Sequence, residues 1–421
     1  MNKFACSVVI PSCNRAAKLD LLLAALAAQD TTEPFEVIVV LDGSTDSSRE
    51  VLTTWEQVGV FRSLRWVEQA QRGQAHARNT GSFLARAPIL LFLDDDCIPD
   101  PNLVSVHLKH HAAGDHIVVL GDCEIVRTGS RSLSELSMWM WWEDTNDRRA
   151  APWQPQSYRD FCTGNLSLRR EDFAREGGFD QDFTGYGRED YELGYRLLRR
   201  GVRFVADRGA RARHHNTATV RGMCSAGRQE ARGDVLIARK HPELITGLRL
   251  MSCGDFRTKV AAGLAMYLPW LGAALCLWLR GVLRVEEGLR LRRRWRSGVD
   301  FLWAYFYWRG LHDALGSMKG LRQLRRTAVV ALPQEVDVRR PLPPQVAGLN
   351  IDVPSSLVVL LDGRPVGRLD LKPNLNEPFL PWLSHQISAH LSKEILAEAA
   401  RASLAGSGDV SISLPMFLDP H

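Results

Sequence analysis

The chain has 421 residues, of which 45% are hydrophobic and 24% charged, and its net charge is +5. These proportions are ordinary for a globular protein, and the length predicts two or three domains. The eight cysteines form no Cys-x-x-Cys pair and have no ligand-like spacing. A disulfide framework and a zinc site are therefore disfavoured, and a reducing compartment is expected.

The first third of the chain alternates between short apolar segments and helical patterns. The apolar segments predict strands at residues 6–10, 35–41, 64–68, 90–93 and 117–120. Helical patterns separate them at residues 17–29, 46–58, 72–87 and 102–113. This alternation predicts an α/β domain with a mostly parallel sheet. Neither Gly-x-Gly-x-x-Gly after the first strand nor a phosphate loop ending in Gly-Lys-Ser/Thr is present, so the two commonest nucleotide-binding signatures are missing.

Three carboxylates, Asp94, Asp95 and Asp96, follow the apolar strand at residues 90–93. Ligands of open α/β sheets bind outside the carboxyl ends of the strands. In an extended segment the side chains of Asp94 and Asp96 point the same way and converge on one hard cation, such as Mg²⁺ or Mn²⁺. The alternative is a polar turn that simply ends the strand.

An aromatic cluster at residues 138–142 precedes a polar segment bounded by prolines. This pattern is typical of a mobile flap or an acceptor surface. The alternative is that the tryptophans pack in the core.

A second acidic cluster lies between residues 162 and 201. A strand is expected at residues 162–168, and glycines precede Glu189 and Asp190, which begin a helix. Carboxylates are favoured in a first helical turn, which is a purely structural explanation for the pair. The alternative is a loop that delivers a carboxylate into a cleft. His214 and His215 follow a strand near residues 203–206 and offer a third metal ligand.

Several of these segments together resemble glycosyltransferase family 2. The resemblance rests on residues 7–15, 39–46, 77–79 and 94–96, in that order. Residues 164–165 and 185–190 resemble the acceptor-side motif of galactosyltransferase-like proteins. The resemblance covers roughly residues 4–243. It implies a GT-A fold, a nucleoside-diphosphate-sugar donor and a divalent metal, Mn²⁺ or Mg²⁺.

The resemblance also implies roles for single residues. Asp190 is expected to be the catalytic base, with Glu189 as its neighbour near the acceptor or donor sugar. Asp96 and Asp94 are expected at the metal, with His214 or His215 completing its shell. The residues expected to bind the nucleotide sugar are Pro11, Cys13, Arg15, Asp42, Arg78, Asp94, Asp95, Gly164 and Asn165. Of these, Pro11 and Cys13 line the nucleobase pocket in this prediction.

One departure from the family pattern concerns the base. Leu41 stands where many members carry an Asp before Asp42. Uridine is favoured over thymidine or guanosine, while the sugar and acceptor are not identified.

The chemistry of glycosyl transfer matches these residue types. The leaving diphosphate needs charge neutralisation, which a metal and Arg78 supply. The acceptor hydroxyl needs a base, which Asp190 supplies. A single displacement with inversion follows chiefly from the family resemblance.

The C-terminal half combines apolar and basic segments. Residues 260–279 carry no charge, and residues 280–326 contain twelve Lys or Arg against four Asp or Glu. Twenty apolar residues are long enough to span a bilayer, but Pro269 and two glycines interrupt them. Aromatics interleaved with arginines favour attachment to an anionic membrane surface over a single span. A packed helical domain is the remaining alternative, and nucleic-acid binding is disfavoured.

Residues 333–344 are rich in proline and charge and predict a linker. After it, Asp362-Gly363 predicts a β-hairpin between residues 356–361 and 366–371. An amphipathic helix is expected at residues 380–405 and a strand at residues 410–414. The expected domains are therefore a GT-A catalytic domain (1–245), a basic and aromatic membrane-associating helical region (246–330) and a small α+β module (331–421).

The leading hypothesis is a metal-dependent inverting glycosyltransferase that builds a cell-surface glycan or uses a lipid-linked acceptor. The N-terminus has no signal-peptide pattern, so a cytoplasmic enzyme at the inner face of the membrane is expected. One alternative is a sugar nucleotidyltransferase that uses the same carboxylates. The other is an inactive, membrane-associated subunit that binds a nucleotide sugar.

Overall fold

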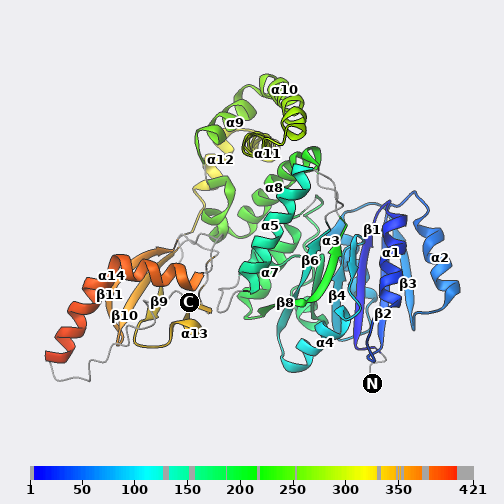
Figure 1. Cartoon of the computed structure of the whole chain (residues 1–421), viewed down its shortest axis with the longest axis horizontal. Helices are drawn as coiled ribbons and strands as arrows, with labels where there is room; N and C mark the ends of the chain where they lie inside the picture. Colours follow the sequence, from blue (N-terminus) through cyan, green and yellow to red (C-terminus); the bar gives the residue numbers. More distant parts are fainter. Residues whose placement is uncertain are drawn as a thin grey trace.

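The computed structural model describes residues 4–404 except positions 127–131, 151–156, 186, 216–218, 252–253, 330–332, 348, 350, 352–354 and 372–378. Figure 1 shows three parts: a large sheet flanked by helices, a group of helices beyond α8, and a small module with its own sheet. These parts confirm the expected α/β, helical and α+β regions.

The large sheet contains eight strands in the part of the chain that is described. They are β1 (Cys6–Ser12), β2 (Phe35–Asp42), β3 (Leu64–Gln69), β4 (Ile89–Leu93), β5 (Cys97–Pro99), β6 (Ile117–Ile125), β7 (Asn165–Arg169) and β8 (Arg203–His214). Their order across the sheet is β3-β2-β1-β4-β7-β6-β8-β5. Strands β3, β2, β1 and β4 are parallel, as are β6 and β8, whereas β7 and β5 run antiparallel to their neighbours. The mostly parallel sheet is thus confirmed.

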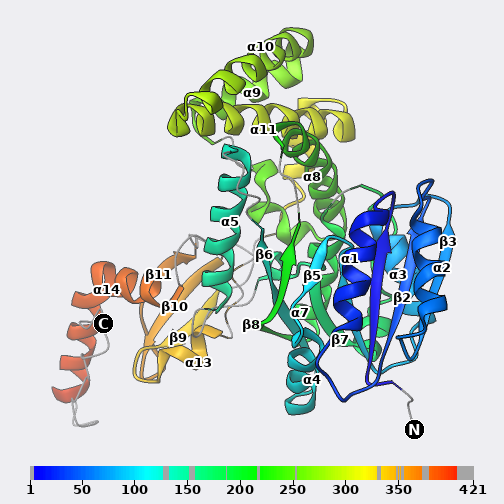
Figure 2. The same ribbon diagram turned by 45° about the vertical axis from the view of Figure 1, so that its right-hand side comes forward.

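Helices pack on both faces of this sheet, as Figure 2 shows from a second side. One face packs against α1 (Ala16–Ala27), α2 (Ser48–Val58), α4 (Leu103–Ala113) and α5 (Leu133–Ala150), and the other against α3 (Gln74–Leu84), α6 (Arg170–Arg175) and α7 (Glu189–Arg199). Successive strand side chains alternate, so Leu91 joins the first core and Phe92 the second. Burial on both faces explains the continuous apolar runs in the sequence.

The parallel strands bring three polar turns to one edge of the sheet. Strand β1 lies between β2 and β4, and all three run in the same direction. Their carboxyl ends are followed by residues 13–15, 43–46 and 94–96. This edge is where ligands of open α/β sheets are expected.

The aromatic segment at residues 138–142 forms part of helix α5, not a flap without regular structure. Trp142 is buried and joins the core on one face of the sheet, while Trp141 is half exposed. The core alternative is therefore right for Trp142. The proline-rich flank at residues 151–156 lies outside the described residues.

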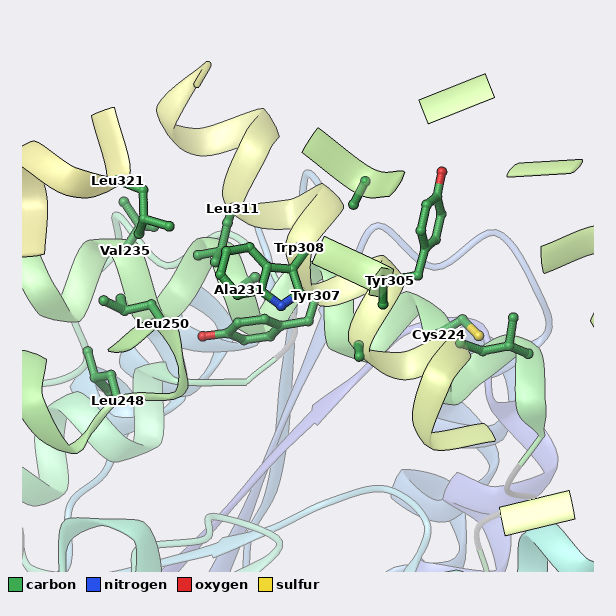
Figure 3. Packing of buried hydrophobic residues seen from close by; sticks show 14 of the residues in the cluster. Cys224, Ala231, Val235, Leu248, Leu250, Tyr305, Tyr307, Trp308, Leu311 and Leu321 are labelled. Atoms are coloured by element: carbon green, nitrogen blue, oxygen red, sulfur yellow. The ribbon is translucent and has the colours of Figure 1, made fainter. Parts of the chain in front are cut away.

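The helical part extends from α8 and shares one hydrophobic cluster with the sheet domain. Figure 3 shows the part of this cluster that lies in the helical part. Its elements are α8 (Val220–Lys240), η2 (Pro242–Gly247), η3 (Arg249–Met251), α9 (Phe256–Tyr267), α10 (Pro269–Gly288), α11 (Arg292–Leu315) and α12 (Met318–Arg325). The cluster contains Tyr158 and Tyr195 from the sheet domain as well as Trp308 of α11. Residue 245, the predicted end of the catalytic domain, thus lies within a hydrophobic cluster that both parts share.

The apolar run at residues 260–279 is divided between two helices. Helix α9 ends at Tyr267, and Pro269 begins α10, where a proline is tolerated because the first helical N–H has no intrahelical partner. Among the described residues, no helix is long and apolar enough to cross a membrane.

The C-terminal module contains β9 (Gln334–Asp337), α13 (Leu342–Ala347), β10 (Ser355–Leu361), β11 (Arg364–Leu371) and α14 (Phe379–Leu404). The hairpin is confirmed: β10 and β11 are antiparallel, and Asp362 and Gly363 both have positive φ. The linker prediction for residues 333–344 is wrong, because β9 pairs in parallel with β10. Only this nonlocal pairing reveals the strand. The strand expected at residues 410–414 lies outside the described residues.

Candidate active site

The three carboxylates after β4 lie in a turn. The N–H of Cys97 donates to the carbonyl of Asp94 over 3.0 Å, which closes the turn. The extended geometry expected for Asp94 and Asp96 is therefore wrong, and the two side chains have different partners. Asp94 faces Arg78, whereas Asp96 faces Arg15 and His214.

Asp96 is buried among three basic side chains. His214 Nε2 lies 3.2 Å from its Oδ1, and Arg15 and Lys18 lie 2.8 and 3.2 Å from its Oδ2. Burial raises the pKa of Asp96, but the hydrogen bond from His214 and the two cations lower it well below the ordinary value. Asp96 therefore remains ionised at neutral pH.

Lys18 is a site residue that the sequence reasoning missed. Its ammonium group also donates to the carbonyl of His215 over 2.8 Å. Lys18 lies three residues after Arg15, which caps the start of α1, and both side chains reach Asp96. This i, i+3 spacing beside a polar strand end is the signal that predicts it.

One group of potential metal ligands is present among the described residues: Asp96, Cys97 and His214, whose donor atoms lie within 4.8 Å of one another. A carboxylate oxygen and an imidazole nitrogen are suitable donors for Mn²⁺. Asp94 does not belong to this group. His215 contributes its backbone N–H, which donates to the Asp96 carbonyl over 2.8 Å.

Asp95 ties the turn to β1. It accepts hydrogen bonds from Ser12 Oγ and Arg15 Nη1, both at 2.7 Å. Burial raises the pKa of Asp95 above the ordinary value, although Arg15 opposes that shift. These contacts hold Arg15 between Asp95 and Asp96.

Arg78 connects the first acidic cluster to the second. Its guanidinium donates to Asp94 over 2.8 Å and to Glu189 over 3.0 Å. It is 1% exposed and also lies over the ring of Phe179. The prediction placed Arg78 near the base or diphosphate, but the described contacts occupy it with two carboxylates.

Glu189 and Asp190 begin helix α7, as expected, but their surroundings differ. Glu189 is buried, its Oε1 accepts from Arg78, and its Oε2 has no hydrogen-bond partner. The side chain of Asp190 accepts a hydrogen bond from the N–H of Tyr191. Burial and the charge of Glu189 raise the pKa of Asp190 to about 7. A carboxyl group of this pKa accepts a proton effectively near neutral pH.

Asp42 organises the turn before α3. Its carboxylate accepts hydrogen bonds from the N–H groups of Arg72 and Gly73 and from the side chain of Gln69, each at 2.8 Å. An open pocket of about 530 Å³ lies beside this turn, lined by Gln71, Arg72, Gly73, His76, Gln181 and Thr184. Pro11 is buried in β1, and Cys13 contacts Gln71 through its sulfur. Cys13 and Asp42 thus both contact residues that line this pocket.

Gly164 and Asn165 have different positions. The carbonyl of Gly164 accepts from the N–H of Asp94, so this residue borders the carboxylate turn. Asn165 is 1% exposed, and its side chain donates to the carbonyls of Asp122 and Ala210. Its Oδ1 lies 2.9 Å from the ring of His107. Protein groups therefore occupy the donors and the acceptor of Asn165.

The sequence matches two protein-family models and several known glycosyltransferases. Residues 7–177 match the model of glycosyl transferase family 2, and residues 149–218 match a model described as the N-terminal domain of galactosyltransferase. Validoxylamine A glucosyltransferase of Streptomyces hygroscopicus subsp. jinggangensis is 37% identical over 278 residues, covering 58% of this chain and 62% of the relative. Chondroitin synthase of Escherichia coli is 29% identical over 237 residues, covering 49% of this chain and 34% of the relative. The chain thus spans less than two thirds of these relatives.

Among solved structures, a mannosyltransferase from Pyrobaculum calidifontis, in complex with GDP-Man and Mn²⁺, has a TM-score of 0.45 and 21% identity, covering 72% of this chain and 86% of that one. The family assignment rests on the sequence matches. The matched residues, 7–218, contain every predicted site residue. Residues 7–177 therefore form a glycosyltransferase family 2 segment, and a galactosyltransferase-like segment overlaps it and continues to residue 218.

Proposed function

We propose that this protein transfers a glycosyl group from a nucleoside diphosphate sugar to an acceptor hydroxyl, with inversion at the anomeric carbon. One observation carries the proposal. The buried Arg78 joins Asp94 to Glu189, and the adjacent Asp190 has a pKa of about 7. This link supports the proposal that Asp190 accepts a proton close to Asp94, which would contact the sugar donor.

In the proposed reaction, Asp190 accepts the proton of the acceptor hydroxyl. The hydroxyl oxygen forms a bond to the anomeric carbon while the bond from that carbon to the diphosphate breaks. The nucleoside diphosphate leaves with the electron pair of the broken bond. Arg78 fixes Asp94 and Glu189 and thereby positions the carboxylates on both sides of the reacting centre.

The expected metal fits the residues around Asp96. Asp96 and His214 would hold it, and Asp94 of the same turn stays a candidate ligand. When bound, Mn²⁺ or Mg²⁺ neutralises the charge of the leaving diphosphate. The side chains of Arg15 and Lys18 are 44% and 34% exposed, so we propose that these two cations contact the phosphates directly. Arg78 is only 1% exposed and pairs with two carboxylates.

The donor and acceptor are proposed from chemistry and from the relatives. A uridine diphosphate sugar is the favoured donor. The relatives' names cover a small acceptor, validoxylamine A, and the polysaccharide chondroitin. We propose a glycan or lipid-linked acceptor at the cytoplasmic membrane face, with an acceptor like validoxylamine A as the competing class.

The proposed membrane contact is the outer surface of helices α9 and α10. Trp270, Leu277 and Trp278 are 71%, 73% and 64% exposed, and arginines follow in residues 280–296. Exposed tryptophans beside basic residues are typical of a protein that lies on an anionic bilayer. Flotation with phosphatidylglycerol vesicles tests this contact. Trp270→Ser with Trp278→Ser should weaken binding about tenfold or more, while Trp141→Ser on α5 should leave it unchanged.

The activity is tested by incubating the whole chain with Mn²⁺ and a panel of UDP-, TDP- and GDP-sugars and acceptors. We expect release of the nucleoside diphosphate and an acceptor product whose anomeric configuration is inverted in its NMR spectrum. Release of pyrophosphate from a nucleoside triphosphate and a sugar phosphate would instead identify a nucleotidyltransferase. Donor binding without any turnover would identify an inactive subunit.

A further inference from the structure

The residue before the two carboxylates of α7 has an unusual backbone. Arg188 has φ of 84° and ψ of −21°, in the left-handed region that favours glycine. For any residue other than glycine, including Arg188, this conformation costs about 1 kcal/mol or more, so surrounding contacts must maintain it. Because Glu189 and Asp190 follow directly, the conformation of Arg188 sets where these carboxylates emerge.

Helix α8 supplies the contacts that hold Arg188. Its Nε donates to Asp234 over 2.6 Å, and its Nη2 donates to Glu230 over 3.0 Å. The side chain of Arg188 can approach α8 this closely because residue 233 is glycine. A Cβ there would lie 2.6 Å from Cγ of Arg188.

Helix α11 completes this arrangement from the helical region. The hydroxyl of Tyr307 donates to the second carboxylate oxygen of Asp234 over 2.6 Å. Tyr307 and Asp234 are 2% and 1% exposed, so water does not compete for this contact. The Tyr307 ring stacks on Trp303, and Figure 3 shows Tyr307 in the core formed by α8 and α11.

Resting on the proposed function, we propose that Tyr307 is a positioning residue for the catalytic carboxylate. It acts through Asp234, which orients Arg188 and so the first turn of α7. Tyr307 lies about ninety residues beyond the matched family segment, which ends at residue 218. The helical region therefore takes part in building the active site.

The test compares two tyrosines of the same helix. Tyr305 is also buried, but its hydroxyl donates to the carbonyl of Pro269 over 2.9 Å, away from Arg188. Tyr307→Phe and Tyr305→Phe each remove one hydroxyl and keep the ring. Both variants should lose a few degrees of melting temperature, since each loses one buried hydrogen bond.

Only Tyr307→Phe should lower kcat, by about tenfold, with the KM for the donor unchanged, because the misplaced carboxylate affects the transition state more than donor binding. The acidic limb of its pH–rate profile should also move to higher pH, since Arg188 lowers the pKa of Asp190. The other groups that act on or face Asp190 are Glu189, Arg78, Cys162 and Tyr191. They are unchanged in both variants.

A double-mutant cycle with Arg188→Gly provides a second measurement. Glycine adopts the left-handed conformation without the bond to Asp234. In the Arg188→Gly background, Tyr307→Phe should therefore leave kcat unchanged, because the arginine side chain through which Tyr307 and Asp234 act is already absent. Equal kcat losses in Tyr307→Phe and Tyr305→Phe, or independent effects of Tyr307→Phe and Arg188→Gly, would overturn the inference. A wild-type chain without transferase activity would contradict the proposed function instead.

Discussion

The turn after β4 and the first turn of α7 both present carboxylates to the same region, because Arg78 bonds to one residue of each. Around Asp96 the partners are three basic groups, and the pKa of this carboxyl lies well below its ordinary value. Around Asp190 burial dominates, and the pKa rises to about 7. Asp96 and Asp190 thus differ in charge state near neutral pH, which suits the proposed roles of cation binding for Asp96 and proton acceptance for Asp190.

Different parts of the chain hold the two acidic clusters in place. Arg15 caps the start of α1, Lys18 lies in α1 and His214 ends β8, so the turn after β4 is held by side chains of the sheet domain. Arg188 instead depends on α8 and, through Asp234, on α11. The proposed proton acceptor is thus linked to the helical region, whereas these contacts of the proposed cation-binding turn lie within the sheet domain.

The largest expected effect is the loss of the proton acceptor. Asp190→Asn should lower kcat by about 10²–10⁴, because an amide cannot take the proton of the acceptor hydroxyl. Steady-state kinetics measure this change. Asp115→Asn, which alters an exposed carboxylate paired with Arg169, should retain full kcat.

Stability distinguishes this loss from misfolding. The folded pKa of Asp190 is raised above 3.8, so the ionised form is penalised by folding, and its contribution to stability declines as pH rises from about 4 to about 7. Asp190→Asn removes that penalty and should therefore melt at a higher temperature than wild type at pH 8. A normal kcat in this variant would remove Asp190 from the mechanism.

Asp96→Asn should reduce kcat by about 10²–10³ and weaken the activation by added Mn²⁺, because the diphosphate loses charge neutralisation. Titration of a chelator-treated enzyme with Mn²⁺ measures the activation constant. Asp100→Asn is the matched control, since Asp100 pairs with Arg211 on β8 outside the metal-ligand group. Equal Mn²⁺ activation in wild type and Asp96→Asn would place the metal elsewhere.

The pH dependence should separate the two clusters. Below pH 7 the wild-type kcat/KM should fall about tenfold per unit, because protonation of Asp190 removes the base. Asp96 should not contribute to this limb, since its pKa is far lower. A profile without any break between pH 5 and 8 would contradict the assignment of the base.

The smallest effect is expected at the link between the clusters. Glu189→Gln leaves the buried Arg78 with one ionised carboxylate, and a severalfold loss of kcat is expected because Arg78 is held less firmly. Glu192→Gln, on the same helix and paired with Arg196, should lose stability without losing kcat. Matching kcat values for the two variants would show that Arg78 does not position the site.

The sequence by itself determined the elements whose signals are local. Continuous apolar runs predicted the parallel strands, since burial on both faces leaves no polar alternation, and Asp362-Gly363 predicted the hairpin. The carboxylates at residues 94–96 and 189–190 were located for the same reason: strand ends and helix starts are readable from neighbouring residues. Family resemblance then supplied their expected roles.

Only the tertiary structure decided which carboxylate has which surroundings. The turn at residues 94–97 separates Asp94 from Asp96, and no periodic pattern distinguishes such a turn from an extended end. The pairing of β9 with β10 and the bond between Tyr307 and Asp234 join residues far apart in the chain. The pKa of Asp190 depends chiefly on burial, which arises when these distant segments pack.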